Sequence, residues 1–172
     1  RSRGRKAARM SYDVAITDGP VRAIFDLKGP QAALADWAGD TLPGFPDAPN
    51  RRVREDGKTL AHIGPDHWLL IADLTREEAL TDALKPADAP PEISIVRVSD
   101  VYAWVRITGP DAAHVTATGC PLDLETFPED GASFTEFFTQ KALITRGGHG
   151  FEVAIDRSYA PWIAEMLARI TP

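Results

Sequence analysis

The stretch "LKGPQAALADWAG" at residues 27–39 returns 80 positions later as "ITGPDAAHVTATG" at residues 107–119. The Gly-Pro pair, the two following alanines and the final glycine coincide in the two copies. Proline is favoured in the first turn of a helix, where its missing N–H is not needed, and glycine is favoured just after the last turn. The sequence therefore predicts a short helix in each copy, over residues 30–39 and 110–119.

A second pair of related stretches lies further along each copy. "WLLIADLTREEALTDAL" at 68–84 corresponds to "FEVAIDRSYAPWIAEML" at 151–167, an offset of 83. In both, an apolar strand ends in Asp and leads into an amphipathic helix headed by a hydroxyl residue. Thr75 and Glu78 have the spacing of a capping box, and Ser158 is the matching cap candidate. Two nearly constant offsets indicate one unit present twice.

Period-two alternation of apolar residues predicts the strands, and turn residues between them predict hairpins. A loop is expected between the first helix and the second hairpin of each copy. The four predicted hairpins are 12–16 with 21–27, 59–63 with 68–72, 93–98 with 101–107, and 142–145 with 151–155.

These elements predict an α+β fold of two pseudo-repeated strand-strand-helix-strand-strand-helix halves, with helices on one side of antiparallel strands. The connection is expected at residues 85–91, "KPADAPP", because its three prolines stop helix and sheet. A single domain over 11–172 is predicted, with halves at about 11–85 and 92–172. Its 172 residues are enough to bury a core without disulfides.

The charge of the chain is unevenly distributed. Five of its 19 basic residues lie in the first nine positions, so the remainder carries 14 basic against 25 acidic residues, a net charge of −11. We interpret residues 1–10 as a disordered basic tail or a cloning remnant, with a nucleic-acid arm or a transit peptide as the alternatives. An acidic body repels phosphate backbones, so nucleic acid is not an expected partner.

Composition also bears on location. One cysteine cannot form an internal disulfide, and no apolar run approaches the roughly 20 residues needed to cross a bilayer. No secretory signal follows the basic start. A cytoplasmic protein with no membrane partner is predicted.

Motifs for metal or nucleotide chemistry are missing from the sequence. The four histidines are not spaced as a zinc site, and no HExxH or CxxC is present. The glycines of "RGGHGFE", residues 146–152, lie between two strands, whereas a phosphate-binding loop leads into a helix. We therefore predict no catalytic, cofactor-binding or metal-binding residues in this chain.

Cys120, in "GCPLDLETFP" at residues 119–128, is the one candidate nucleophile. It follows the helix that begins at Pro110, at the end where the helix dipole disfavours a thiolate. Asp123 would raise the pKa of the thiol further if it lay close. A buried packing role is the interpretation we favour over catalysis.

Three stretches resemble the gamma subunit of heterotetrameric sarcosine oxidase. They are "GPDHWLLIA" (64–72), "RITGPDAAHVTATGCPLDL" (106–124) and "ALITRGGHGFEVAIDRSYAPWIAEML" (142–167). The most specific phrase is Gly-Cys-Pro-Leu-Asp-Leu at 119–124, followed by Phe127 and Pro128. That family's fold is similar to the folate-binding region of aminomethyltransferases, in agreement with the duplicated α+β prediction.

The resemblance implies a non-catalytic, structural role in a complex with alpha, beta and delta subunits. Such a complex oxidises sarcosine to glycine and hands the one-carbon unit to tetrahydrofolate. Its FAD, FMN, NAD and tetrahydrofolate would be held by the other subunits, and none by this chain. Candidate partner contacts are Cys120, Pro121, Leu122, Asp123, Phe127 and Trp68.

Other functions stay open at this point. The related N-methylglutamate dehydrogenases have a similar small subunit, so the amine substrate is not fixed. A free-standing folate-binding, aminomethyltransferase-like protein is a second alternative, which rests on fold analogy alone. A third is a scaffold that has lost its partner.

Overall fold

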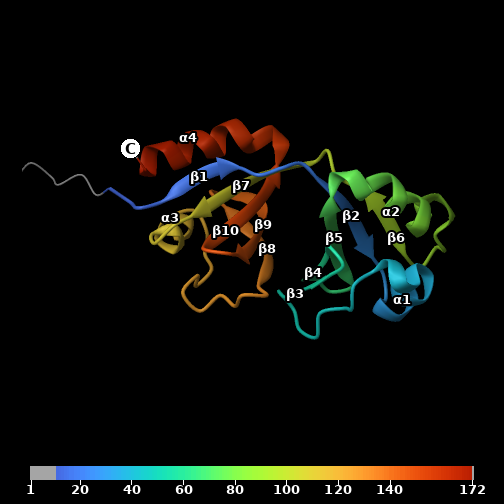
Figure 1. Ribbon diagram of the computed structural model, residues 1–172. Coiled ribbons are helices and arrows are strands. Elements are labelled where there is room, and N and C mark those ends of the chain that lie inside the picture. Colours follow the sequence, from blue (N-terminus) through green and yellow to red (C-terminus); the bar gives the residue numbers. More distant parts are fainter. Residues whose placement is uncertain (1–10, 172) are drawn as a thin grey trace, which may run out of the picture.

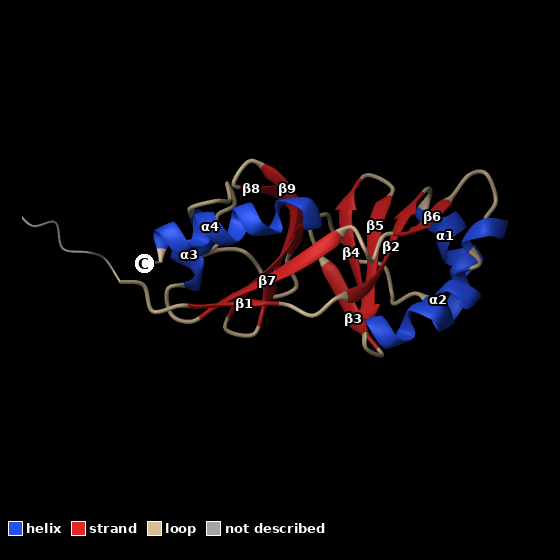
Figure 2. Cartoon of the chain, turned by 90° about the horizontal axis from the view of Figure 1, so that it is seen from above, coloured by secondary structure: helices blue, strands red, loops and turns tan. Residues whose placement is uncertain are grey.

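The computed structural model describes residues 11–171, and the predicted basic tail at 1–10 lies outside them (Figure 1). Two five-stranded antiparallel sheets meet in the middle of the molecule, with helices on their outer faces (Figure 2). The predicted α+β class is confirmed. The layers run helices, sheet, sheet, helices.

The first sheet has the strand order β3-β4-β5-β2-β6 and the second has β8-β9-β10-β7-β1. In the first sheet the strands are β2 (Arg22–Lys28), β3 (Arg52–Glu55), β4 (Lys58–Gly64), β5 (His67–Asp73) and β6 (Ser94–Arg97). In the second they are β1 (Ala15–Asp18), β7 (Tyr102–Thr108), β8 (Ala132–Phe137), β9 (Gln140–Gly147) and β10 (Gly150–Asp156). The helices are α1 (Gln31–Ala38), α2 (Glu77–Leu84), α3 (Ala112–Ala117) and α4 (Ala160–Ile170).

The sequence repeat is also a repeat of strand register. In the first sheet Arg22 lies opposite Asp73 and Lys28 opposite His67. At offsets of 80 and 83, Tyr102 lies opposite Asp156 and Thr108 opposite Gly150. The repeats thus form the same sheet twice, around an approximate two-fold axis.

This axis passes between the edge strands β3 and β8. The amide of Arg52 donates to the carbonyl of Asp130 at 2.9 Å, and the amide of Ala132 donates to that of Asn50 at 3.0 Å. Arg52 and Ala132 are 80 positions apart, so the two hydrogen bonds are related by the same axis. They join the edges of the two sheets directly.

Two of the predicted hairpins are wrong, because the repeats exchange their first strands. β1 pairs with β7 and β6 pairs with β2, so 12–16 does not pair with 21–27, nor 93–98 with 101–107. The chain crosses from one sheet to the other at Gly19, whose amide donates to the Trp104 carbonyl at 2.7 Å. A Cβ at Gly19 would lie 2.6 Å from the Cβ of Trp104, so the crossing needs glycine.

The other two hairpins are confirmed, at β4–β5 and β9–β10. β3 and β8 lie where only loops were expected. Residues 85–91 connect α2 to β6, but the sheets do not follow the division at 85–91, since β6 belongs to the sheet of the first repeat.

The predicted helix caps are replaced by the aspartates that end β5 and β10. Asp73 Oδ1 accepts hydrogen bonds from the Thr75 amide at 2.9 Å and its hydroxyl at 2.6 Å. Asp156 Oδ1 accepts the same two bonds from Ser158, at 2.9 and 2.6 Å. Thr75 and Ser158 are therefore donors to the cap, and the capping box of Thr75 with Glu78 is not formed.

Alternating side chains on each strand fill separate cores. On β2, Phe25 and Leu27 face the helices while Ile24 faces the opposite sheet. On β7, Ile107 faces the helices while Trp104 faces the opposite sheet. The inter-sheet layer is therefore buried except along its margins, and one of these margins carries charge.

Candidate functional site: the cleft between the sheets

A cleft of about 520 Å³ opens at one margin of the inter-sheet layer. Its walls are residues 20–22, where the chain enters β2, residues 54–59 of the β3–β4 hairpin, and residues 71–73 at the end of β5. The opposite sheet contributes Arg106 and Glu152. The cleft thus exists because the strand exchange brings two repeats together at this margin.

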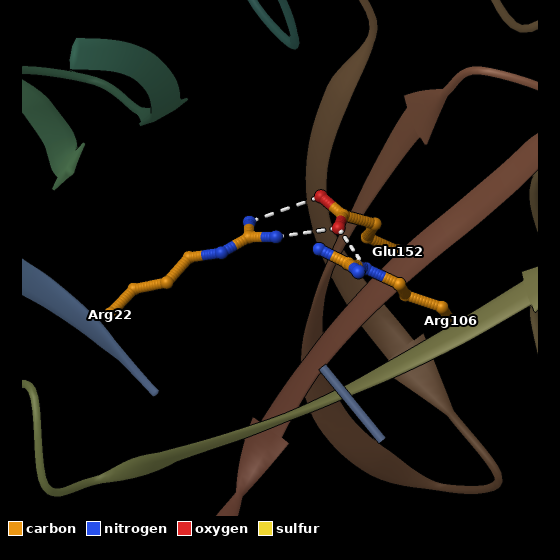
Figure 3. Close-up of polar contacts among 3 residues, drawn as sticks. All are labelled: Arg22, Arg106 and Glu152. Carbon is orange, nitrogen blue, oxygen red and sulfur yellow. Dashed lines mark hydrogen bonds and ion pairs between the residues drawn. The ribbon is translucent and has the colours of Figure 1, made fainter. Parts of the chain in front are cut away.

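Glu152 is held between two arginines (Figure 3). Arg22 reaches from β2 across to β10, where its Nη1 and Nη2 donate to the two carboxylate oxygens at 3.0 and 2.5 Å. Arg106, opposite Glu152 on the neighbouring strand β7, donates from Nε at 2.9 Å. The Arg22 guanidinium also lies 4.1 Å from the ring centroid of Trp104. A bidentate, stacked arginine is the strong form of an ion pair, so this contact orders the margin.

The electrostatics of the cleft are dominated by arginine. Burial would raise the pKa of Glu152, but the hydrogen bonds and charges of Arg22 and Arg106 outweigh it and lower that pKa. Arg52, behind the cleft, has its pKa lowered to about 10 by burial and by the like charge of Arg54. The lining carries four basic residues, Arg22, Arg54, Lys58 and Arg106, and four acidic ones, Glu55, Asp56, Asp73 and Glu152, so that Arg52 behind the cleft leaves one positive charge in excess.

The equivalent margin on the other side of the axis lacks this charge. The strand registers equate Arg22, Arg54 and Glu152 with Tyr102, Phe134 and Leu69. Leu69 is buried, and Tyr102 and Phe134 pack against the inter-sheet core. The two repeats have thus kept the same backbone but differ at this place, since the other margin lacks the arginines and has Asp26, paired with His67, in place of Arg106.

The residues singled out from the sequence do not gather in one site. Cys120 and Phe127 are buried in the core beneath α3 and α4, whereas Trp68 is buried in the core beneath α1 and α2. Pro121 and Asp123 are exposed and Leu122 is half-buried. Among the predicted partner contacts, only these three reach solvent in the structure.

The surroundings of Cys120 favour a neutral thiol. Burial raises its pKa, and a hydrogen bond from the Leu122 amide to Sγ at 3.4 Å offsets this only in part. The thiol is thus buried, as the sequence predicts, in surroundings that disfavour the thiolate.

The histidines are dispersed. His67 Nε2 lies 2.9 Å from Asp26 Oδ1, His62 stacks on Trp68, and His114 and His149 are exposed. Within residues 11–171 no three potential metal ligands cluster together. Over the same range no helix is long and apolar enough to span a membrane.

Sequence reasoning missed Arg22, Arg106 and Glu152. Each is a charged residue on an otherwise apolar strand, a pattern that usually indicates a solvated face. Only the stacking of the second sheet turns that face inward. The mismatch with Tyr102 and Leu69 at the equivalent positions is the one signal that could have found them.

The chain has a duplicated α+β fold in which the two repeats exchange their first strands. No protein-family model matches the sequence, and no curated protein sequence matches it. Solved structures do match. A chain of heterotetrameric sarcosine oxidase from Corynebacterium sp. U-96 in complex with pyrrole 2-carboxylate aligns with a TM-score of 0.77 and 24% identity, over 92% of this chain and 86% of that one.

Two further structures are similar. The aminomethyltransferase T of the glycine cleavage system from Bartonella henselae aligns with a TM-score of 0.66 and 20% identity, over 91% of this chain but 46% of that one. The regulatory subunit of aspartate kinase from Thermus thermophilus gives a TM-score of 0.50 and 15% identity, over 95% of this chain and all of that one. The aminomethyltransferase-like fold expected from the sequence is therefore confirmed.

Proposed function

We propose that this chain is the gamma-type subunit of a heterotetrameric sarcosine oxidase complex. The observation that carries the proposal is the share of each similar chain that this chain covers. The chain covers 86% of a sarcosine oxidase chain, but less than half of an aminomethyltransferase. It therefore matches most of a chain of the first and less than half of the second. The resemblance of "GCPLDL" at 119–124 to the gamma-subunit family supports the same choice.

The role proposed for this chain is structural. The buried thiol of Cys120 is unsuited to nucleophilic chemistry. In the proposed complex, located in the cytoplasm, the alpha, beta and delta subunits hold the FAD, FMN, NAD and tetrahydrofolate. The complex demethylates sarcosine to glycine and passes the one-carbon unit to tetrahydrofolate.

Two exposed aromatic side chains at the start of α4, Tyr159 in the preceding 3-10 turn and Trp162 in the helix, support docking to a partner. Tyr159 is 43% exposed and Trp162 is 37% exposed. They lie three positions apart, where the 3-10 turn leads into the helix. Tyr and Trp are enriched at protein interfaces, where their rings become buried.

Coexpression with the alpha, beta and delta subunits of a sarcosine oxidase tests the proposal. We expect this chain to elute with them in gel filtration and to be needed for full sarcosine-dependent oxygen uptake. Elution of the chain by itself, with undiminished oxidase activity in the remaining subunits, would contradict it.

A second candidate, a free-standing folate-binding protein, is favoured by the match to aminomethyltransferase over 91% of this chain. Titration of the purified chain with tetrahydrofolate separates the two, because saturable micromolar binding would favour the second. The small subunit of an N-methylglutamate dehydrogenase is a variant of the first candidate. Oxygen uptake or dye reduction with sarcosine and with N-methylglutamate distinguishes them.

A further inference from the structure

We propose that the cleft between the sheets is a binding site for a small oxyanion, a carboxylate or a phosphate group, held by Arg54 and the terminal nitrogens of Arg106. This inference does not rest on the proposed function, since it depends only on the residues that line the cleft.

Some of the arginine nitrogens in the cleft are free to bind a ligand. Arg22 uses both terminal nitrogens on Glu152, but Arg106 uses only Nε (Figure 3). The Arg106 side chain is 42% exposed, and its Nη1 and Nη2 make no hydrogen bond within residues 11–171. Arg54, on the facing wall, is exposed and makes no ion pair with any described residue. Two guanidinium groups on opposite walls are thus available, and such groups bind oxyanions in a bidentate manner.

Four acids line the cleft; Glu152 is paired with arginines, whereas Asp73 and Glu55 accept hydrogen bonds from uncharged groups. Glu152 is neutralised by two arginines, and Asp73 accepts from Thr75. Glu55 accepts from the amide of Gly44 at 3.2 Å. Asp56, on the exposed hairpin turn, is the exception. The positive charge of Arg52 behind the cleft adds to the attraction for an anion.

The cleft has the size of a small-molecule site and a partly apolar lining. A volume of about 520 Å³ is typical of small-molecule sites. Ile71 and Ala72 line one wall, while Pro20 and Val21 line the entrance beside Arg22. A small anion with an apolar body fits such a lining better than a fully hydrated ion.

The internal repeat offers a comparison, because each residue of the cleft has an equivalent position at the other margin. The other margin has the same backbone and lacks the arginines, with Tyr102, Phe134 and Leu69 in place of Arg22, Arg54 and Glu152. The arginine cluster is therefore not required by this fold at that place. The charged margin is consequently more than a requirement of packing, because burying charge without need costs stability.

The site is tested by amide NMR titration of the full chain with inorganic phosphate and, separately, with benzoate. Chloride keeps the ionic strength constant. We expect saturable shifts at residues 20–22 and 54–59 with at least one probe. Saturation by phosphate alone assigns a phosphate ligand, and saturation by benzoate alone assigns a carboxylate. The absence of saturable shifts with both probes would overturn the proposal.

Variants make the test specific. Arg54→Ala, at an exposed position, is expected to weaken binding by about tenfold, because it removes one charge-assisted contact. Arg169→Ala, on the far surface of α4, is the matched control and is expected to leave binding unchanged. Glu152→Gln is expected to tighten binding, since it removes the competing carboxylate. Equal affinity in Arg54→Ala and the unsubstituted chain would contradict the assignment.

Discussion

Arg22 on β2 forms a two-point ion pair with Glu152 on β10, and this pair connects the two sheets across the charged margin (Figure 3). The contact spans 130 positions in the sequence, from one repeat to the other. Its strength therefore affects how the sheets are held together as well as the shape of the cleft.

Replacing Glu152 by Gln leaves Arg22 and Arg106 without a counter-charge in a half-buried place. We expect the free energy of unfolding to fall by about 2 kcal/mol, the order of a charge-assisted hydrogen-bonded pair. Urea denaturation measures it. Glu165→Gln is the control, because its pair with Arg169 is exposed and contributes at most about 0.5 kcal/mol. Equal losses of unfolding free energy in the two variants would show that the ion pairs of Glu152 with Arg22 and Arg106 do not hold the sheets together.

The lowered pKa of Glu152 makes the stabilisation by its ion pairs with Arg22 and Arg106 depend on pH. A carboxylate whose pKa is lower in the folded state stabilises the fold fully above its ordinary pKa of 4.5, and this contribution is lost as the pH falls through the lower value. The stability difference between the unsubstituted chain and Glu152→Gln should therefore shrink below about pH 4.5. A difference that stays constant down to pH 3 would contradict this cause.

Asp73 and Asp156 are equivalent caps, so their removal should have similar effects. Asp73→Ala and Asp156→Ala each remove two hydrogen bonds at the start of a helical segment, from Thr75 and Ser158 respectively. We expect both to lower Tm in calorimetry. Asp36→Ala, an exposed position on α1, is the control. If only one cap variant lowered Tm, the energetic equivalence of the repeats would fail.

The thiol of Cys120 should react slowly in the folded chain. Burial and a raised pKa both reduce the reactive thiolate at neutral pH. We expect labelling by Ellman's reagent to be slow under native conditions and fast in urea. Cys120→Ala should leave the activity of an assembled complex unchanged. Rapid labelling of the native chain, or loss of activity in the variant, would restore a chemical role.

Trp162 tests the docking surface on α4. Trp162→Ala should lower the Tm of the isolated chain modestly, because Trp162 is 37% exposed but its ring packs edge-on against Phe138. If a partner covers it, affinity for the other subunits should fall by at least about tenfold. Surface plasmon resonance measures this, with Glu165→Ala on the same helix as control. Unchanged affinity would place the partner elsewhere.

The sequence repeat was enough to predict the class of fold and the β4–β5 and β9–β10 hairpins. These hairpins are local, and turn residues such as Gly64-Pro65-Asp66 lie between their strands. The partners of β1 and β6 could not be predicted, because period-two alternation identifies a strand but not its neighbour. The segment at Gly19 and Pro20, where the chain passes from one sheet to the other, has the residues of a hairpin turn, so the sequence does not distinguish the two.

The site was harder to predict than the fold. Arg22, Arg106 and Glu152 come from three strands that are distant in the sequence, and their meeting depends on the stacking of the two sheets. Cys120 attracted attention as the one thiol, yet its environment is apolar. In this chain the rare residue, Cys120, was a poor guide to the site. The charged residues Arg54 and Glu152, which stand where the other repeat has Phe134 and Leu69, are a better one.

The charged cleft and the equivalent margin both depend on the exchange of first strands, and fragment complementation tests that exchange directly. A fragment of residues 92–172 lacks β1 and carries β6, which belongs to the other sheet. We predict that fragments 11–91 and 92–172 show no cooperative thermal transition alone, and regain one by circular dichroism when mixed. Cooperative melting of each fragment by itself would show that each repeat keeps its own first strand, contrary to this account.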